Sequence, residues 1–483
     1  MMDMTAIDRK FDELRVSARI PGAAFALVMG DETYVKGFGL RDVERKLPMT
    51  AETLYPIAST TKAINATLLA LLIEDGLLAW DVPIREYGAK ISFLDPVVAQ
   101  LATLRDLVSM RTGLPRHDWV WLGNPAPREE VVGRLAHLPS SASFRERFQY
   151  NNLTVTAAAA IAEHVTGQLW EDLILSRLLT PLQMSATGFR RPDDGSDTQS
   201  YFETADRALV QTRRVSTDST GPSGGNIHSN MFDMAKWLAF NLDGGCSGGQ
   251  RLIRTEALTE LFTPVIPMGT DPVSPSPNAC YGLGWFIDTY YGHDRLSHTG
   301  YLHDVNSVVL FFPNSRIGIA VATNFGSPRV ARQLGEELSA EFLGLGSNDE
   351  VSKKLAKYEK EISDNIKRIQ SLSRVYNTEP SHPISDHVGA YEAAGYGLIE
   401  IVLADDHLEL VFNEFHFSLM HRHYDCWVFD SHETFSVHLP HPFDTASTIM
   451  FATDSDGKIH SLTIALEPSV EPICFERLLD TAP

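Results

Sequence analysis

The sequence is poor in cysteine, and its few cysteines are scattered. Only four occur in 483 residues, and no two of them form a Cys-x-x-Cys pair. Their wide spacing argues against a zinc site and against a dense disulfide framework. We therefore interpret them as buried thiols or as residues without a chemical role. They are Cys246, Cys280, Cys426 and Cys474.

Long apolar runs and an excess of basic residues are also missing. The first residues, MMDMTAIDRKFDELRV, lack the basic segment and apolar run of a secretory signal, and no later apolar stretch reaches the roughly 18 residues that would span a bilayer. The formal charge of −21 argues against nucleic acid or an anionic membrane as a partner. Acidity alone names no substrate. We expect a soluble cytoplasmic protein, with an oligomeric state that composition does not determine.

What is present is a chain long enough for more than one core, with 43% hydrophobic residues. Residues 22–43 read as two strands around a turn. Residues 59–242 have helical patterns, and residues 281–324 return to strands, beginning with YGLGWFID. This order predicts an α+β domain over residues 1–345, in which strands from both ends of the region form one antiparallel sheet and helices are inserted between them.

The remainder of the chain has a different character. Residues 346–383 combine charge with apolar residues at helical spacing and then a polar, proline-containing stretch, which predicts a linker helix. Residues 384–483 contain short alternating aromatic segments, including FSVHL, and predict a small antiparallel barrel or sandwich. Six histidines of this region lie on different segments without a ligand spacing, so we expect no metal. They are His416, His421, His423, His432, His438 and His441.

The first chemical motif is Ser59-Thr60-Thr61-Lys62, at the start of a predicted helix that ends near Gly76. Residues three apart share one helix face, so Lys62 lies over the hydroxyl of Ser59 and can supply the base that a serine nucleophile needs. The helix start adds amide donors and a positive field. A second match, at Ser455 to Lys458, contains an Asp-Gly hairpin turn and is given no functional weight.

Two further motifs follow. Tyr150-Asn151-Asn152 precedes an alanine-rich helix, and there a tyrosine beside a lysine can relay a proton while an asparagine holds a substrate amide. His298-Thr299-Gly300 closes a predicted strand whose edge can pair with an extended acyl substrate.

In this order the three motifs resemble those of the penicillin-binding-protein and serine β-lactamase family: S-x-x-K, then Y-x-N, then H-x-G. Flanking text over roughly residues 20–324 is similar too, and the last hundred residues resemble the lipocalin-like extension of some members. The resemblance implies a β-lactamase/transpeptidase-like fold and a serine hydrolase without a cofactor. The flanking segments are LYPIAS, LRDLVSMRTGLP, SGGNIHS and YGLGW.

The resemblance also implies roles. Ser59 would attack a carbonyl, and Lys62 with Tyr150 would shuttle its proton. Asn152 would orient the substrate, and the backbone amides of Ser59 and Tyr301 would form the oxyanion hole.

Other residues would bind substrate. His298, Thr299 and Gly300 would form the substrate strand, with histidine where most β-lactamases have lysine. In the segment LPRHDWVW, which lies near the pocket mouth in related folds, Trp119 and Trp121 are either an apolar wall for the acyl group or simple loop packing.

Departures from the family pattern leave three hypotheses. A third motif with histidine in place of lysine resembles the motif of aminopeptidases, D-stereospecific peptidases, esterases and some peptide cyclases. We therefore do not expect efficient β-lactam hydrolysis. The first hypothesis is a hydrolase that cleaves an amide or ester bond of a small molecule or peptide through an acyl-Ser59 intermediate. The second passes the acyl group to an alcohol or amine, and the third is a scaffold without turnover.

Overall fold

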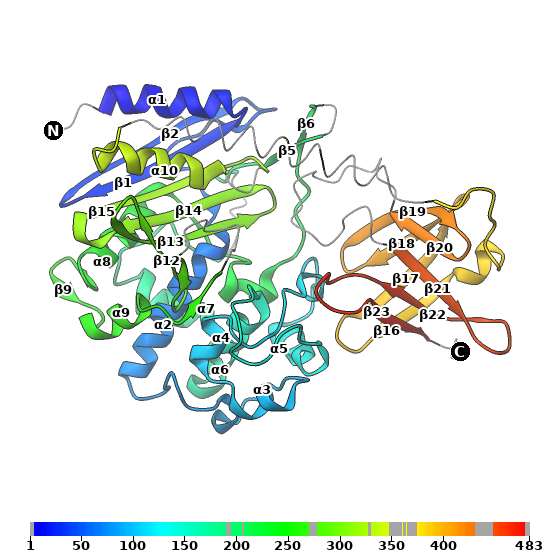
Figure 1. The fold of residues 1–483 in the computed structure, drawn as a ribbon. Helices are drawn as coiled ribbons and strands as arrows, with labels where there is room; N and C mark the ends of the chain where they lie inside the picture. The colour runs from blue at the N-terminus through cyan, green and yellow to red at the C-terminus, as the bar shows by residue number, and fades with distance from the viewer. Residues whose placement is uncertain are drawn as a thin grey trace.

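The computed structural model describes residues 4–189, 195–204, 207–269, 278–326, 330–346, 360, 364, 374–429 and 448–478. An N-terminal α+β body and a C-terminal barrel lie side by side (Figure 1). Both were predicted, and both are confirmed. Most of the predicted linker helix, the segment FSVHL, and His432, His438 and His441 lie outside the described residues.

One nine-stranded antiparallel sheet forms the centre of the body. β1 pairs with β15, so strands from the two ends of the region meet as predicted. The order is β10-β11-β12-β13-β14-β15-β1-β2-β3. The bounds are β1 Gly22–Met29, β2 Glu32–Asp42, β3 Leu47–Pro48, β10 Ile266–Pro267, β11 Cys280–Tyr281, β12 Phe286–Tyr290, β13 His293–Leu302, β14 Val305–Phe312 and β15 Ile317–Thr323.

Helices cover both faces of this sheet because its central strands are apolar on both sides. β1 and β15 are buried almost throughout. Helices α1 (Met4–Ser17) and α10 (Val330–Phe342) lie on one face, where Phe11 contacts Phe25 at a ring distance of 4.8 Å. Helix α8 (Met231–Leu242) packs on the other face, against β1 and β15.

The inserted helical region lies beyond α8, below the sheet in Figure 1. Its central helix, α2 (Thr61–Glu74), is buried along twelve of its fourteen residues. The other α-helices are α3 Pro96–Leu101, α4 Leu104–Val108, α5 Arg128–Gly133, α6 Asn152–Thr166, α7 Trp170–Ile174 and α9 Thr255–Leu261. Three short strand pairs complete the body: β4 Tyr55–Pro56 with β7 His228–Ser229, β5 Tyr201–Glu203 with β6 Leu209–Gln211, and β8 Cys246–Ser247 with β9 Gln250–Arg251.

One predicted strand was wrong. YGLGWFID is two strands, β11 and β12, joined by a tight turn at residues 282–285. Gly284 in that turn has φ +82, and a Cβ at this position would lie 2.7 Å from the carbonyl oxygen of Lys62. The turn therefore packs directly on the backbone of the predicted catalytic helix, an approach that only glycine permits.

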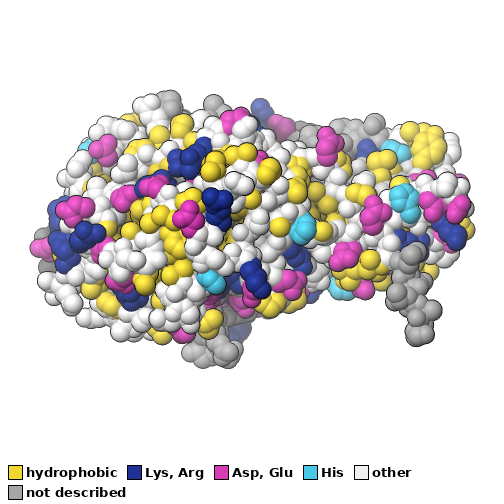
Figure 2. Space-filling model, turned by 90° about the horizontal axis from the view of Figure 1, so that it is seen from below, with side chains coloured by type: hydrophobic (Ala, Val, Ile, Leu, Met, Phe, Trp, Pro, Cys, Tyr) yellow, Lys and Arg dark blue, Asp and Glu magenta, His cyan; other side chains and the backbone are white. Residues whose placement is uncertain are grey.

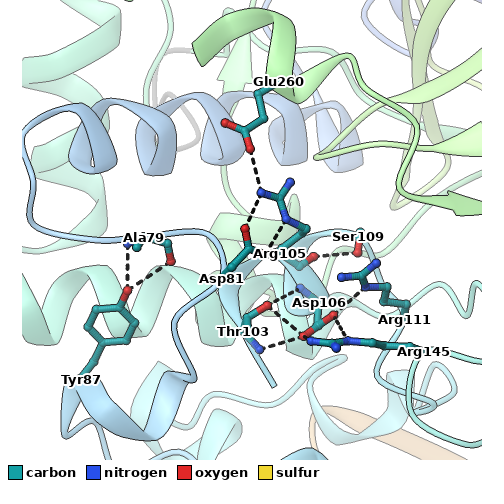
Figure 3. Close-up of polar contacts among 10 residues, drawn as sticks. All are labelled: Ala79, Asp81, Tyr87, Thr103, Arg105, Asp106, Ser109, Arg111, Arg145 and Glu260. Carbon is teal, nitrogen blue, oxygen red and sulfur yellow. Dashed lines mark hydrogen bonds and ion pairs between the residues drawn. The ribbon is translucent and has the colours of Figure 1, made fainter. Parts of the chain in front are cut away.

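A buried carboxylate ties together two segments that lead to the predicted site (Figure 3). Asp106 forms a capping box with Thr103 at the start of α4, and its side chain is fully buried. Arg111 donates to it at 2.6 Å, and Arg145 donates to both of its oxygens at 2.8 Å. The chain that leads to Arg116 and the chain that leads to Tyr150 are thus anchored on one group.

The barrel closes through eight antiparallel strands, with β16 pairing to β23. Alternating apolar side chains, including Trp427 and Phe475, fill its interior. The strands are β16 Gly389–Ala393, β17 Gly397–Ala404, β18 His407–Phe412, β19 Phe415–His423, β20 Cys426–Phe429, β21 Thr448–Thr453, β22 Ile459–Ile464 and β23 Ile473–Arg477.

Figure 2 shows one face of the molecule, on which acidic and basic side chains are interspersed over body and barrel alike. In the part of the chain that the structure describes, no helix combines the length and the apolar character needed to cross a bilayer.

Candidate active site

Ser59 lies in a short 3-10 helix, η1 (Ala58–Thr60), that leads directly into α2. Its side chain is partly exposed, whereas the residues on either side are buried. Ala58 has φ 50, a left-handed conformation that is uncommon for a residue with a Cβ and is often found at functional sites. The turn thus presents the Ser59 hydroxyl at the surface of a rigid element.

Strand β13 passes close to this turn because the third motif ends in glycine. A Cβ on Gly300 would lie 2.4 Å from the carbonyl oxygen of Ile57 and 3.0 Å from the Cβ of Ala58. Such contacts would push the strand away from η1. Glycine here lets the first and third motifs meet.

Lys62 is fully buried, and its amine has three polar neighbours. Nζ lies 2.9 Å from Ser59 Oγ, 2.7 Å from Asn152 Oδ1 and 2.5 Å from the carbonyl oxygen of Ser223. Burial lowers the pKa of Lys62 well below its usual value; the positive charge of Arg116 lowers it further, and Asp118 opposes the shift.

A neutral amine fits these neighbours. It has two N–H groups and one lone pair, and Asn152 Oδ1 and the Ser223 carbonyl can each accept from one N–H. The lone pair then faces the Ser59 hydroxyl. The site can hold Lys62 as a base aimed at Ser59.

Asn152 is held at both ends of its carboxamide. Its oxygen accepts from Lys62, and its nitrogen donates to Asp118 Oδ1 at 3.1 Å. The same carboxylate accepts from Trp121 Nε1 at 2.9 Å and from Arg116 Nε at 2.6 Å. In this structure Asn152 therefore links Lys62 to Asp118, a different contact from the substrate contact predicted for it.

The ring of Tyr150 lies close to both Lys62 and Arg116. Its ring centroid is 4.8 Å from Lys62 Nζ and 4.9 Å from the guanidinium carbon of Arg116. Phe148 and His298 approach the same ring at 6.4 Å and 6.3 Å. The structure thus brings the tyrosine of the second motif to the lysine of the first.

His298 is fully buried, and both of its ring nitrogens have partners. Nδ1 lies 2.7 Å from the carbonyl oxygen of Thr299, and Nε2 lies 3.0 Å from the hydroxyl of Tyr281. Burial, with the nearby charge of Lys62, lowers its pKa to about 3. His298 is therefore neutral near pH 7, donating from Nδ1 and accepting at Nε2, and it does not replace the charge of the family's lysine.

Beyond Ser297, β13 is paired on one side only among the described residues, because β12 ends opposite that position while β14 continues. His303 and Asp304 have φ 49 and 59, so they form the two-residue type I′ turn between β13 and β14. In such a hairpin Leu302 exchanges hydrogen bonds with β14, and the pattern alternates along the strand. The N–H of Tyr301 consequently points to the side that β12 has left, as an oxyanion donor on this edge would.

Trp119 does not face the catalytic centre. It is 2% exposed and packs against three rings of the barrel, Phe412, Phe415 and Phe417. This leaves no surface for an acyl group, so the prediction of an acyl wall is wrong for Trp119. Trp121 is also buried, and its indole nitrogen holds Asp118.

Trp119 and Trp121 are buried because residues 116–123, here called the docking loop, lie between the predicted active site and the barrel. His117 contacts the hydroxyl of Tyr396 at 2.7 Å, and its backbone N–H donates to Glu467 at 3.1 Å. Asn413, in the β18–β19 turn, donates to the carbonyls of Trp119 and Leu122 at 3.2 Å and 3.0 Å.

Residues on one side of the docking loop thus contact the neighbours of Lys62, while residues on the other side contact the barrel. Sequence reasoning missed Arg116 and Ser223 and gave Asp118 no role. For Arg116 and Asp118, the only available signal was an arginine and an aspartate two residues apart in a loop. Ser223 acts through its backbone carbonyl, which carries no sequence signal.

The structure also describes two further predicted substrate residues and three of the six C-terminal histidines. Thr299 and Tyr301 are partly exposed on β13, beside the Gly300 contact with η1. In the barrel, His416 lies 3.3 Å from Glu409, and His421 contacts the carbonyl of Tyr424 at 2.7 Å. These contacts account for two of the three described barrel histidines named in the sequence analysis.

Comparison with known proteins agrees with this geometry. Residues 7–343 match the family model described as Beta-lactamase, and residues 373–477 match a model for a domain of unknown function. The unguisins hydrolase of Aspergillus violaceofuscus is 27% identical over 450 residues, which cover 83% of this chain and 77% of that protein.

Two solved structures show the same fold. The octameric penicillin-binding protein homologue from Pyrococcus abyssi aligns with a TM-score of 0.63 and 21% identity, covering 98% of this chain and all of that one. The D-amino acid amidase from Ochrobactrum anthropi, complexed with L-phenylalanine amide, aligns with a TM-score of 0.58 and 21% identity over 74% of this chain and 99% of the amidase.

Proposed function

From the premise that this chain belongs to the beta-lactamase family, as the match over residues 7–343 shows, we propose that it is a serine hydrolase that cleaves an amide or ester bond of a small molecule or peptide through an acyl-Ser59 intermediate. The observation that carries the proposal is the environment of Lys62. A buried amine with lowered pKa lies 2.9 Å from the nucleophile's oxygen, and two carbonyl groups occupy its N–H donors.

The chemistry follows from these contacts. Ser59 Oγ attacks the substrate carbonyl carbon while its proton passes to Lys62 Nζ. The oxyanion that forms is stabilised by the backbone N–H groups of Ser59 and Tyr301. Collapse of this intermediate breaks the bond to the leaving group, which departs with the proton returned from Lys62, directly or through Tyr150. Water then attacks the acyl-enzyme by the same route and releases the acid.

Similarity to a hydrolase of unguisins and to a D-amino acid amidase favours an amide of a peptide or amino-acid derivative over other acyl compounds. His298 is neutral, so the third motif offers no positive charge to a substrate carboxylate. We also propose that the chain divides at residues 345/346 and 383/384 into catalytic domain, linker and barrel.

The test is intact-protein mass spectrometry after exposure to a fluorophosphonate, a penicillin and a series of p-nitrophenyl esters. We expect one adduct on the wild type and none on Ser59→Ala. Ser455→Ala is the matched control, because it alters the exposed second S-x-x-K match in the β21–β22 turn, and it should be labelled like the wild type. Turnover of the esters should disappear with Ser59→Ala as well.

Other outcomes distinguish the remaining hypotheses. If added amines or alcohols appear in the product in preference to water, the enzyme is an acyltransferase. Absence of an adduct from every probe on the wild type contradicts the proposal and favours the scaffold. Labelling of Ser59→Ala at wild-type level would show that another residue is the nucleophile.

A further inference from the structure

Arg116 is an accessible cation at the centre of the proposed active site. Its guanidinium carbon lies 4.9 Å from the ring centroid of Tyr150, and Lys62 Nζ lies 4.8 Å from the same centroid. The side chain of Arg116 is 43% exposed, whereas its partner Asp118 is only 11% exposed. A positive charge is thus partly exposed to solvent beside Tyr150.

The contacts of Arg116 leave both of its Nη nitrogens available to a ligand. Nε donates to Asp118 at 2.6 Å, which fixes the plane of the guanidinium. No other described residue accepts from its Nη nitrogens, and these nitrogens are not buried. Two parallel N–H groups on adjacent nitrogens match the two oxygens of a carboxylate.

The two basic side chains of the motifs, Lys62 and His298, cannot bind a substrate carboxylate in this way. Lys62 is fully buried and is occupied by Ser59, Asn152 and Ser223. His298 is buried and has a partner at each ring nitrogen. Of these three, only Arg116 is accessible to a substrate.

We propose that Arg116 binds a carboxylate group of the substrate and thereby directs the enzyme toward acyl compounds that carry a free carboxylate near the scissile bond. The inference rests on the proposed serine hydrolase function and names its substrate class. Asp118 fixes the arginine from behind, so the Nη nitrogens are oriented before the substrate arrives, which limits the entropy lost on binding.

The test compares substrates that differ only in charge. Half esters of glutarate, adipate and pimelate with p-nitrophenol place a carboxylate on the acyl side, and each is paired with its carboxamide. Acetate esters of 3-hydroxybenzoate and 3-hydroxybenzamide place the same pair on the leaving group. For each pair, kcat/KM of the carboxylate is divided by kcat/KM of the carboxamide, after subtraction of the uncatalysed rate, for wild type, Arg116→Gln and Arg116→Lys.

We expect at least one pair to favour the carboxylate in the wild type, and Arg116→Gln to reduce that ratio by about 10- to 100-fold, the usual effect of a charge-assisted hydrogen bond. Arg116→Lys should retain part of the preference because it keeps the charge. A general loss of activity through Lys62 or Asp118 affects both members of a pair and leaves the ratio unchanged, so the ratio reports recognition.

Two results would overturn the inference. If the wild type turns over both members of every pair at similar rates, or if Arg116→Gln preserves the preference, Arg116 is not the carboxylate site while the hydrolase function stands. If no substrate acylates Ser59 in the wild type, the proposed function itself fails, and this inference fails with it.

Discussion

Asp118 accepts a hydrogen bond from the side-chain nitrogen of Asn152 at 3.1 Å, which orients the carboxamide oxygen toward Lys62. The same carboxylate pairs with Arg116 at 2.6 Å. Two groups of opposite charge in one short loop, Arg116 and Asp118, therefore act on Lys62 electrostatically. Its pKa, already lowered by burial, is lowered further by Arg116 and raised by Asp118.

This arrangement predicts that two single substitutions move the pH profile in opposite directions. If neutral Lys62 is the base, kcat/KM rises as pH rises through its pKa. Arg116→Gln removes a charge that lowers this pKa, so the rise moves to higher pH. Asp118→Asn removes a charge that raises it, so the rise moves to lower pH. Profiles of a neutral ester between pH 5 and 10 measure both.

Arg177→Gln is the control for these profiles. Arg177 pairs with Asp75 on the surface and contacts none of the residues around Lys62 described above, so its loss should leave the profile in place. Shifts of Arg116→Gln and Asp118→Asn in the same direction would contradict Lys62 as the titrating base.

His298 predicts a pH dependence of stability. Its pKa is near 6.5 when exposed and about 3 in the fold, so the unfolded chain gains a proton between these values while the native protein does not. Stability consequently falls as pH falls from about 6.5 toward 3, by up to about 1.4 kcal/mol per pH unit from this group. His298→Gln, which cannot protonate, should lose less. Urea unfolding at pH 7, 6 and 5 compares the two slopes, and parallel curves would show that His298 is not held neutral.

The spacing of residues in the sequence predicted the Ser59–Lys62 pair, whereas the contacts that depend on long-range packing could not be predicted from it. Ser59 and Lys62 lie three residues apart where η1 continues into α2, so their proximity follows from spacing alone. Tyr150 and His298 could be placed only through the resemblance, because the sheet and α6 that bring them together are far apart in the sequence. The α+β body and the barrel followed from strand and helix periodicity.

The errors have physical causes. Two roles stayed open for Trp119, an acyl wall or loop packing, because Phe415, which packs on it, is almost 300 positions away in the sequence and cannot be inferred from the local pattern. YGLGWFID looked like one strand because its apolar residues mask the turn at Gly284. Arg116 and Asp118 received no role because nothing in the local sequence shows that the fold brings their charges near Lys62.

Asp106 predicts a large loss of stability from a nearly isosteric change. Asp106→Asn removes the charge that pairs with Arg111 and Arg145, leaving two guanidinium groups around a fully buried position. Breaking a buried pair in this way costs about 3–5 kcal/mol. Asp81→Asn is the control, because Asp81 also pairs with an arginine but its side chain is 68% exposed, and it should cost less than about 1 kcal/mol. Urea denaturation measures both, and equal losses would contradict a structural role for the Asp106 cluster.

The contact of the barrel with the docking loop predicts that a change in the barrel slows catalysis. Asn413→Gly removes the two hydrogen bonds to the carbonyls of Trp119 and Leu122. Since Asn413 has φ 54, glycine adopts its backbone conformation without strain. The docking loop should then hold Arg116 and Asp118 less well, and kcat should fall by a few-fold to about tenfold.

Asp405→Gly is the matched control for this experiment. Asp405 has φ 52 and is exposed in the neighbouring β17–β18 turn, so the substitution makes the same backbone change in the same barrel, away from the docking loop. Its kcat should equal that of the wild type. If Asn413→Gly also retains full kcat on both small esters and peptides, the barrel does not hold the docking loop in its active geometry, and its contact with Trp119 serves stability alone.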